Sequence, residues 1–123
     1  MIDISQREKE VIELLRNLSG ESEERIQNIL LALMSYALMQ YAEGEEIVVP
    51  LFGDFKIIYR GDKIIENKRE AQLDSFFSPS NILRKNIGQY EDFKNDKGNL
   101  SDIEIVKYHK NGIENIIKYN LNK

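Results

Sequence analysis

The segment from Glu23 to Ala42 constrains the fold of this chain more than any other. Its apolar side chains cover more than one face of a predicted helix: Ile26, Ile29, Leu30, Leu31, Leu33, Met34, Ala37, Leu38, Met39 and Tyr41. A helix that is apolar most of the way round must be buried from several sides. It is either the core helix of a compact monomer or the interface of a homodimer. We favour the dimer, because a chain of 123 residues builds only a small core of its own.

The residues around this segment predict an α+β fold. A first helix, residues 6–18, precedes a break at Gly20. Two short strands, residues 47–49 and 55–60, flank the turn "PLFGD", in which Gly53 supplies a backbone shape closed to residues with a Cβ. The stretch "AQLDSFF" then returns as a third strand. A protruding β-ribbon is therefore predicted, with its tip within residues 62–68.

A short helix is predicted after the ribbon. Ser78 is its expected cap, Pro79 its first residue and Gly88 its end. These elements make residues 1–92 one domain, followed by a linker and C-terminal extension at residues 93–123.

The extension itself allows two interpretations. Ser101 with Glu104 forms a capping box, which predicts a helix. Asn111-Gly112 between two runs rich in Ile, Val and Tyr predicts a β-hairpin, which we favour.

The two predicted helices are followed by two motifs that resemble the HU/IHF family, the small DNA-bending proteins of bacterial chromatin. The order of the helices and motifs is also similar to that of the family. "EGEEIVVPLFGDFKI" at residues 43–57 is similar to the family's helix end, strand, Gly-Phe-Gly-x-Phe turn and strand, with Leu51 in place of the first Gly. "FSPSNILRK" at residues 77–85 resembles its Phe-x-Pro-Gly-x-x-Leu-Lys entry to the last helix, with Ser80 in place of the Gly. The resemblance covers roughly residues 3–92.

This resemblance implies an intertwined homodimer, in which helices form a base and sheets form a saddle with two arms that embrace the DNA minor groove. The implied interface comprises Ile29, Leu30, Leu33, Met34, Ala37, Leu38, Phe52, Phe55 and Phe77. It implies an architectural, cytoplasmic protein of the bacterial nucleoid with low sequence specificity. The arm departs from the family, because it is shorter and lacks the Arg-Asn-Pro that kinks DNA: the only prolines are Pro50 and Pro79.

Charge is divided unevenly along the chain. Residues 1–55 carry four basic and eleven acidic groups, whereas residues 56–123 carry thirteen basic and ten acidic ones. The expected phosphate-binding residues are Lys56, Arg60, Lys63, Lys68, Arg69, Arg84 and Lys85. The alternative is a solvated ribbon edge whose mixed charges prevent aggregation. Ile64 and Ile65 are candidates for an intercalating wedge or for ordinary packing within the ribbon.

Other functional classes find little support in the sequence. There is no Cys, which excludes disulfides, thiol nucleophiles and Cys-based zinc sites, and the only His is His109. We expect no enzyme, no metal and no cofactor. No apolar run approaches about 18 residues, so no membrane span is expected. The second hypothesis is a scaffold reused as a protein-interaction or assembly module without DNA, with the C-terminal extension contacting a protein partner.

Overall fold

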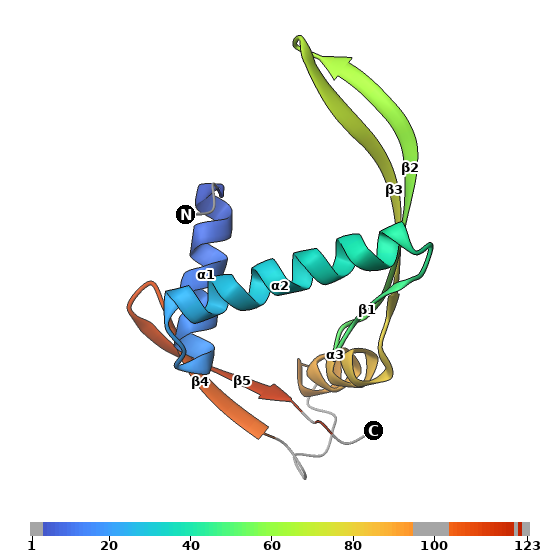
Figure 1. Cartoon of the computed structure of the whole chain (residues 1–123). Helices are drawn as coiled ribbons and strands as arrows, with labels where there is room; N and C mark the ends of the chain where they lie inside the picture. Colours follow the sequence, from blue (N-terminus) through green and yellow to red (C-terminus); the bar gives the residue numbers. More distant parts are fainter. Residues whose placement is uncertain (1–3, 95–103, 120, 122–123) are drawn as a thin grey trace.

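The computed structural model describes residues 4–94, 104–119 and 121. The elements follow the order α1 (Gln6–Ser19), α2 (Glu23–Ala42), β1 (Ile47–Val49), β2 (Gly53–Ile65), β3 (Lys68–Pro79), α3 (Asn81–Lys94), β4 (Glu104–Lys110) and β5 (Ile113–Tyr119). In Figure 1, α1 crosses the start of α2, and β2 and β3 rise as a long ribbon near the other end of α2. The α+β order and the bounds of the second helix are confirmed.

Both N-terminal helices begin at serine caps. The Ser5 hydroxyl accepts a bond from the Glu8 N–H (3.2 Å), and the Glu8 carboxylate accepts one from the Ser5 N–H (3.3 Å). α1 stops at Gly20, whose φ of 75° reverses the chain. The Ser22 hydroxyl then accepts from the Arg25 N–H (3.2 Å) at the start of α2. These caps satisfy backbone donors that the first turn of a helix leaves unpaired.

The three-stranded antiparallel sheet has the order β1-β2-β3. Gly53 begins β2 with a φ of 145°, and a Cβ there would lie 2.9 Å from the Pro79 Cα, which confirms the predicted need for glycine. Leu51 has a φ of 71°, at the position where the HU/IHF motif has Gly. Ser80 holds this turn, because its hydroxyl donates to the Leu51 carbonyl (2.7 Å) and its N–H to the Phe52 carbonyl (2.7 Å).

The predicted ends of the third helix were wrong. Pro79 closes β3 instead of opening α3, and the cap is Ser80, not Ser78, because the Ser80 hydroxyl accepts from the Leu83 N–H (3.0 Å). β3 is an edge strand of the sheet, and proline is tolerated at the end of an edge strand. Gly88 does not end α3, which runs to residue 94, since a glycine inside a helix costs only about 1 kcal/mol. The helix therefore extends into the predicted linker.

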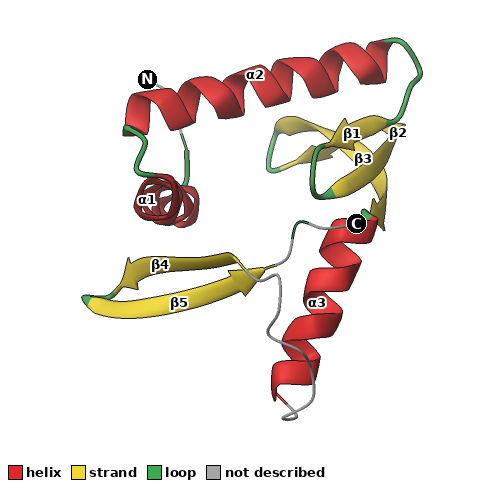
Figure 2. Cartoon of the chain, turned by 90° about the horizontal axis from the view of Figure 1, so that it is seen from below, coloured by secondary structure: helices red, strands yellow, loops and turns green. Residues whose placement is uncertain are grey.

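The C-terminal extension forms a hairpin, which confirms the favoured interpretation. β4 and β5 pair around Asn111-Gly112, whose φ values are 55° and 75°. The competing helix was wrong, since Glu104 lies in β4; Ser101 and most of the linker fall outside the described residues. β4 contacts α1, and Figure 2 shows β5 on the far side of the hairpin from α1.

The single chain buries little. Among the apolar side chains that the structure describes, only Ile12, Ile26 and Ile47 are buried. Two polar contacts join α2 to the segment of β1: the Val48 N–H donates to the Tyr36 hydroxyl (3.1 Å), and the Gln40 amide donates to the carbonyl of residue 46 (3.3 Å). No helix within the described ranges is long and apolar enough to span a bilayer.

Candidate nucleic-acid interface

The ribbon of β2 and β3, called the arm below, ends in a two-residue turn. Ile65 pairs with Lys68, and Glu66 and Asn67 between them have φ values of 50° and 63°. Positive φ at both central residues is typical of the turns that match the twist of paired strands. The tip lies within the predicted range, and Figure 1 shows it projecting far from the helices. Side chains near the tip are therefore open to a large partner.

A β-bulge interrupts the middle of the arm. The register shifts between Tyr59 and Asp62, so that Arg60 and Gly61 together oppose one residue of β3, Gln72. Gly61 has a φ of 97°, which suits glycine. A bulge bends its strand and changes which side chains lie on each face. Here it determines where the cations of the arm point.

The bulge brings four predicted phosphate-binding residues to one face. Below it, Phe55 and Ile57 line a hollow against α2, so Lys56 lies on the opposite, outer face. Because β2 has one extra residue at the bulge, its outward side chains come from even-numbered positions up to Arg60 and from odd-numbered positions above it. On β3, which has no extra residue, the outward side chains remain those of even-numbered positions. This face carries Lys56, Arg60, Lys63, Ile65 and Lys68. A regular strand would have placed Lys63 and Ile65 on the inner face.

Carboxylates inside the arm hold both of its arginines. The Arg60 Nε lies 2.7 Å from Asp74 Oδ2, and the Arg69 Nε lies 3.2 Å from Asp62 Oδ2. The Tyr59 hydroxyl donates to Asp62 Oδ1 (2.6 Å), and this hydrogen bond raises the pKa of Tyr59 above its usual value. Because these groups are largely exposed, each ion pair stabilises the arm by at most about 1 kcal/mol. A phosphate can therefore compete for either guanidinium.

The three lysines of the outer face are differently placed. Lys56, Lys63 and Lys68 are exposed, and they form no ion pair within the described part of the chain. Lys63 lies across from Glu70 in the register, and Glu66 occupies the tip. The lysines are available to an anion, while nearby acids reduce the positive potential around them.

Arg69 and the two α3 cations lie apart from this face. Arg69 is paired with Ile64 in the register and lies on the inner side of the arm. The Arg84 Nε donates to the Pro79 carbonyl (3.2 Å), and Lys85 is half-buried with an interaction inside the chain. α3 lies at the end of the sheet opposite the arm tip (Figure 1). One chain does not bring all seven predicted cations together.

The two candidate wedge residues lie on opposite faces near the tip. Ile64 is 75% exposed on the inner face, and Ile65 is 40% exposed on the outer face. Ile65 lies beside Lys63 and Lys68, whereas Ile64 lies beside the paired Arg69. Ile65 is thus the apolar side chain placed among the available cations.

The base of the outer face differs from its upper part. Phe76 is 57% exposed, Val48 is exposed, and Asp54 lies on the same face. Phe76 and the aspartates that hold the arginines were not among the predicted site residues. Alternation along "DSFFSP" is the signal that places one of the two phenylalanines outward.

The predicted interface residues leave much apolar surface open in the single chain. Those exposed are Ile29, Leu30, Met34, Leu38, Phe52 and Phe77, and those half-buried are Leu33, Ala37 and Phe55. Phe55 and Phe77 stack with ring centroids 4.5 Å apart. Two apolar hollows, of about 350 and 290 Å³, open on α2, one against α1 and one against the sheet. Ile87 and Tyr90 of α3 are also exposed.

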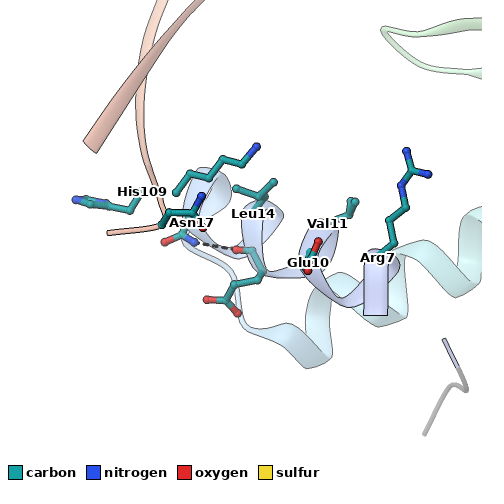
Figure 3. A pocket seen from close by; sticks show the side chains of 9 residues that line it. Arg7, Glu10, Val11, Leu14, Asn17 and His109 are labelled. Carbon is teal, nitrogen blue, oxygen red and sulfur yellow. Dashed lines mark hydrogen bonds between the residues drawn. The ribbon is translucent and has the colours of Figure 1, made fainter. Parts of the chain in front are cut away.

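A further hollow of about 470 Å³ lies between α1 and the C-terminal hairpin. Figure 3 shows Arg7, Glu10 and Asn17 along its α1 wall, with His109 at its far end. The His109 Nε2 lies 3.8 Å from a carboxylate oxygen of Glu114 on β5. No cluster of three or more potential metal ligands occurs among the described residues. The hollow offers polar contacts without an arrangement for nucleophilic chemistry.

The outer face of the arm, with its three available lysines and one apolar side chain near the tip, is the arrangement most suited to a ligand. The chain matches no protein-family model, and it matches none of the curated proteins with which it was compared.

Proposed function

We propose that this chain forms a homodimer that binds double-stranded DNA through paired arms, with low sequence specificity and an architectural role. The observation that carries the proposal is the bulge at Arg60-Gly61. It aligns Lys56, Arg60, Lys63 and Lys68 with Ile65 on one face of a projecting ribbon. Cations neutralise phosphates whatever the base sequence, and an apolar side chain beside them can wedge between base steps. The resemblance to HU/IHF proteins agrees with this mode.

The dimer is supported by the surface that one chain exposes. Its accessible area is 10262 Å², whereas a compact protein of 14.4 kDa exposes about 6,800 Å². Part of the excess belongs to the arm, and the rest includes exposed apolar groups on α2, such as Ile29, Met34 and Leu38. Obligate dimers bury several thousand Å² of such surface. A second copy supplies the same apolar faces in return.

Low sequence specificity follows from the kinds of groups on the arm. Lysines contact phosphates as point charges and carry no base code, while base reading needs donors and acceptors placed in a groove. Both arm arginines already have carboxylate partners, and Glu66 and Glu70 lie near the tip. These acids reduce the affinity expected for each phosphate contact.

Charge reversal of the two tip lysines, Lys63→Glu with Lys68→Glu, tests the DNA-binding half of this proposal. Wild-type protein should bind a generic duplex at about 50 mM salt and lose at least tenfold in affinity by about 200 mM. The double variant should lose most binding at every salt concentration while its circular dichroism stays unchanged. Arg7→Glu with Lys9→Glu on α1 changes the net charge by the same amount, and this control should bind nearly as wild type. Undiminished binding by the double variant would exclude the outer face of the arm.

A substitution in α2 tests the dimer. The Met34 side chain is 55% exposed in one chain and lies in the centre of the proposed interface. Met34→Asp replaces it with a charged carboxylate. It should lower the mass measured by sedimentation from two chains to one, or unfold the protein, because an unpaired buried charge costs several kcal/mol. Ser35→Asp, on the polar side of the same turn, should leave the dimer intact. Equal behaviour of the two variants would argue against the interface.

One observation favours a second function, a protein-interaction module without DNA. Phe76 and Val48 are exposed beside Asp54 at the base of the outer face, where they form apolar surface that phosphate binding does not need. If no duplex binds at low salt, Phe76→Ser provides the next test. Loss of a protein partner by this variant, without a change in mass, would support the interaction module.

A further inference from the structure

The tip of the C-terminal hairpin is open to water. Lys110 and Ile113 close the pairing of β4 with β5, and the two residues between them, Asn111 and Gly112, are exposed. Their φ values are 55° and 75°, and positive φ at both central residues is typical of a type I′ turn. Figure 2 shows this turn at the free end of the hairpin. Apart from its chain neighbours, no atom lies within 4 Å of a Cβ built on Gly112, so this side of its backbone is uncovered.

An asparagine that precedes glycine carries its own reactive groups. The backbone nitrogen of the glycine attacks Cγ, the side-chain amide carbon of the asparagine, so that a C–N bond forms and the amide nitrogen leaves as ammonia. Water then opens the resulting five-membered imide. Hydrolysis at Cγ gives aspartate, and hydrolysis at the backbone carbonyl gives isoaspartate, in which the main chain runs through the side chain. Glycine favours this reaction, because it has no side chain to hinder the approach.

Asn111 is the only asparagine of the sequence that precedes glycine. Asn115 on β5 precedes Ile116, and its side-chain amide donates to the Ile113 carbonyl (2.9 Å). The Asn111 side chain forms no hydrogen bond among the described residues. The hairpin therefore contains one reactive asparagine and a second that its neighbours hinder.

The closed turn holds the reacting atoms apart. The first central residue of a type I′ turn has a ψ of about +30°, which directs the next backbone nitrogen away from the side chain. The imide ring is nearly flat, so the Cα–C bond of Asn111 must rotate out of the turn before the ring closes. Lys110 and Ile113 then separate. The reaction therefore requires a local opening of the hairpin.

The hairpin is suited to such an opening. It shares no strand with the three-stranded sheet, and a two-stranded hairpin alone is marginally stable in water. Its apolar side chains are largely open: Ile113 is 65% exposed and Ile116 is 54% exposed. Regions with few buried contacts open locally far more often than the whole fold unfolds. We therefore expect the hairpin to open while α2 and the arm stay folded.

We propose that Asn111 deamidates spontaneously in the folded chain through local opening of the hairpin, and that the isoaspartate product prevents the hairpin from closing again. The two-residue turn matches the twist of the paired strands, and isoaspartate adds one carbon atom to the main chain within it. The aspartate product keeps the turn, because Asp-Gly also forms type I′ turns. Asn111 lines the hollow between α1 and the hairpin, so the change acts beside the contact of β4 with α1. The proposal depends neither on DNA binding nor on the α2 dimer.

Ageing of the full chain in mildly alkaline buffer tests the reaction. Peptide mapping locates the small mass gain from exchange of NH2 for OH, and enzymatic methylation measures isoaspartate. Folded protein should convert at Asn111 more slowly than the same chain in urea, by up to about a thousandfold, because only the locally open fraction reacts. Asn115 should gain no mass. Asn111→Gly keeps the turn type without a side-chain amide, and should gain none at the turn.

The rates decide whether local opening controls the reaction. A folded rate equal to that in urea would overturn the proposal, because the closed turn would then give no protection. A folded rate more than about a thousandfold lower would also overturn it, because the reaction would then wait for global unfolding. Equal conversion at Asn115 would exclude selection by glycine.

Amide hydrogen exchange tests the effect of isoaspartate, after chromatography has separated this form from the unmodified chain. β4 and β5 should exchange faster than in the unmodified chain, with α2 and the arm unchanged. Asn111→Asp is the matched control, because it carries the same charge on an ordinary backbone and should keep the hairpin protected. Unchanged protection of β4 and β5 in the isoaspartate form would contradict the second half of the proposal.

Discussion

The two β-hairpins of this chain fix their geometry at different places. The arm is shaped at its root by Gly53 and in its middle by the bulge at Gly61, and its tip contains no glycine. The C-terminal hairpin has an unbroken register and is shaped by its tip, Asn111-Gly112. A ribbon that projects into solvent depends on an anchored root, while a short hairpin packed on a helix depends mainly on its turn.

The same difference extends to what each hairpin offers a partner. The bulge collects lysines on one face of the arm, and their charges suit a ligand that approaches that face. β4 and β5 pair in an unbroken register, so each strand keeps a strict alternation of faces. The bulge therefore changes which side chains share a face in the arm, and the register of the C-terminal hairpin contains no such change.

The largest effect is expected at the root of the arm. Gly53→Ala forces a Cβ against the Ser78 carbonyl oxygen at a φ closed to other residues, and should cost about 3 kcal/mol or more of unfolding free energy. Urea denaturation measures the loss. Gly88→Ala, within α3 where no atom lies near the added Cβ, is the control and should stabilise by up to about 1 kcal/mol. Similar effects of the two changes would show that the root is not constrained.

A smaller, local effect is expected at the tip of the second hairpin. Gly112→Ala places a Cβ in the left-handed region and should cost the hairpin about 1 to 2 kcal/mol. Amide hydrogen exchange should show faster exchange in β4 and β5 only. Asn67→Gly at the arm tip is the opposite change and should leave the arm equally or better protected. Loss of protection in α2 after Gly112→Ala would mean that the hairpin supports the body.

The arm can also be changed without touching its backbone. Asp62→Asn with Asp74→Asn releases both arginines, and should raise affinity for duplex DNA about fivefold, since each exposed charge contact is worth up to about 1 kcal/mol. Fluorescence anisotropy measures the change. Glu10→Gln with Glu24→Gln on the helices removes as much charge and should have less effect. An equal gain from both pairs would assign the effect to net charge alone.

The smallest effect concerns pH. The hydrogen bond to Asp62 raises the pKa of Tyr59, so its contribution is fully present below the ordinary tyrosine pKa of about 10 and is lost as pH rises through the folded pKa. An ultraviolet titration should show one tyrosine ionising later than the rest. Tyr59→Phe should remove that late component. A titration in which Tyr59 ionises with the other tyrosines would disprove the contact.

Local signals in the sequence predicted most of the elements. The helical pattern of residues 23–42 and the turn residues Asn111-Gly112 each act within a few neighbours, and the helix and the hairpin that they predict are confirmed. The end of α3 was wrong, because the penalty of Gly88 is small and the helix continues past it. The start was wrong because Pro79 is compatible with the end of an outer strand.

The candidate site was less predictable than the fold. The pairs Arg60–Asp74 and Arg69–Asp62 depend on the register of the arm, and one extra residue in β2 changes that register. An isolated glycine inside a strand is a signal for such a bulge, and Gly61 was not used in this way. The cations could be named from the sequence, whereas the face and partner of each one depend on the register around Gly61.

The extra residue at Arg60-Gly61 also decides what a change in the length of β2 would do. Lys56 and Lys63 are seven positions apart on β2, whereas their partners Phe76 and Glu70 are six positions apart on β3. Deleting Gly61 would make the two separations equal, so the strand would become regular and Lys63 and Ile65 would stay on the outer face. Loss of the bulge without a deletion would instead shift the upper strand by one residue and turn both side chains to the inner face. A shorter β2 would thus preserve the cationic surface that a straightened β2 of the same length would divide.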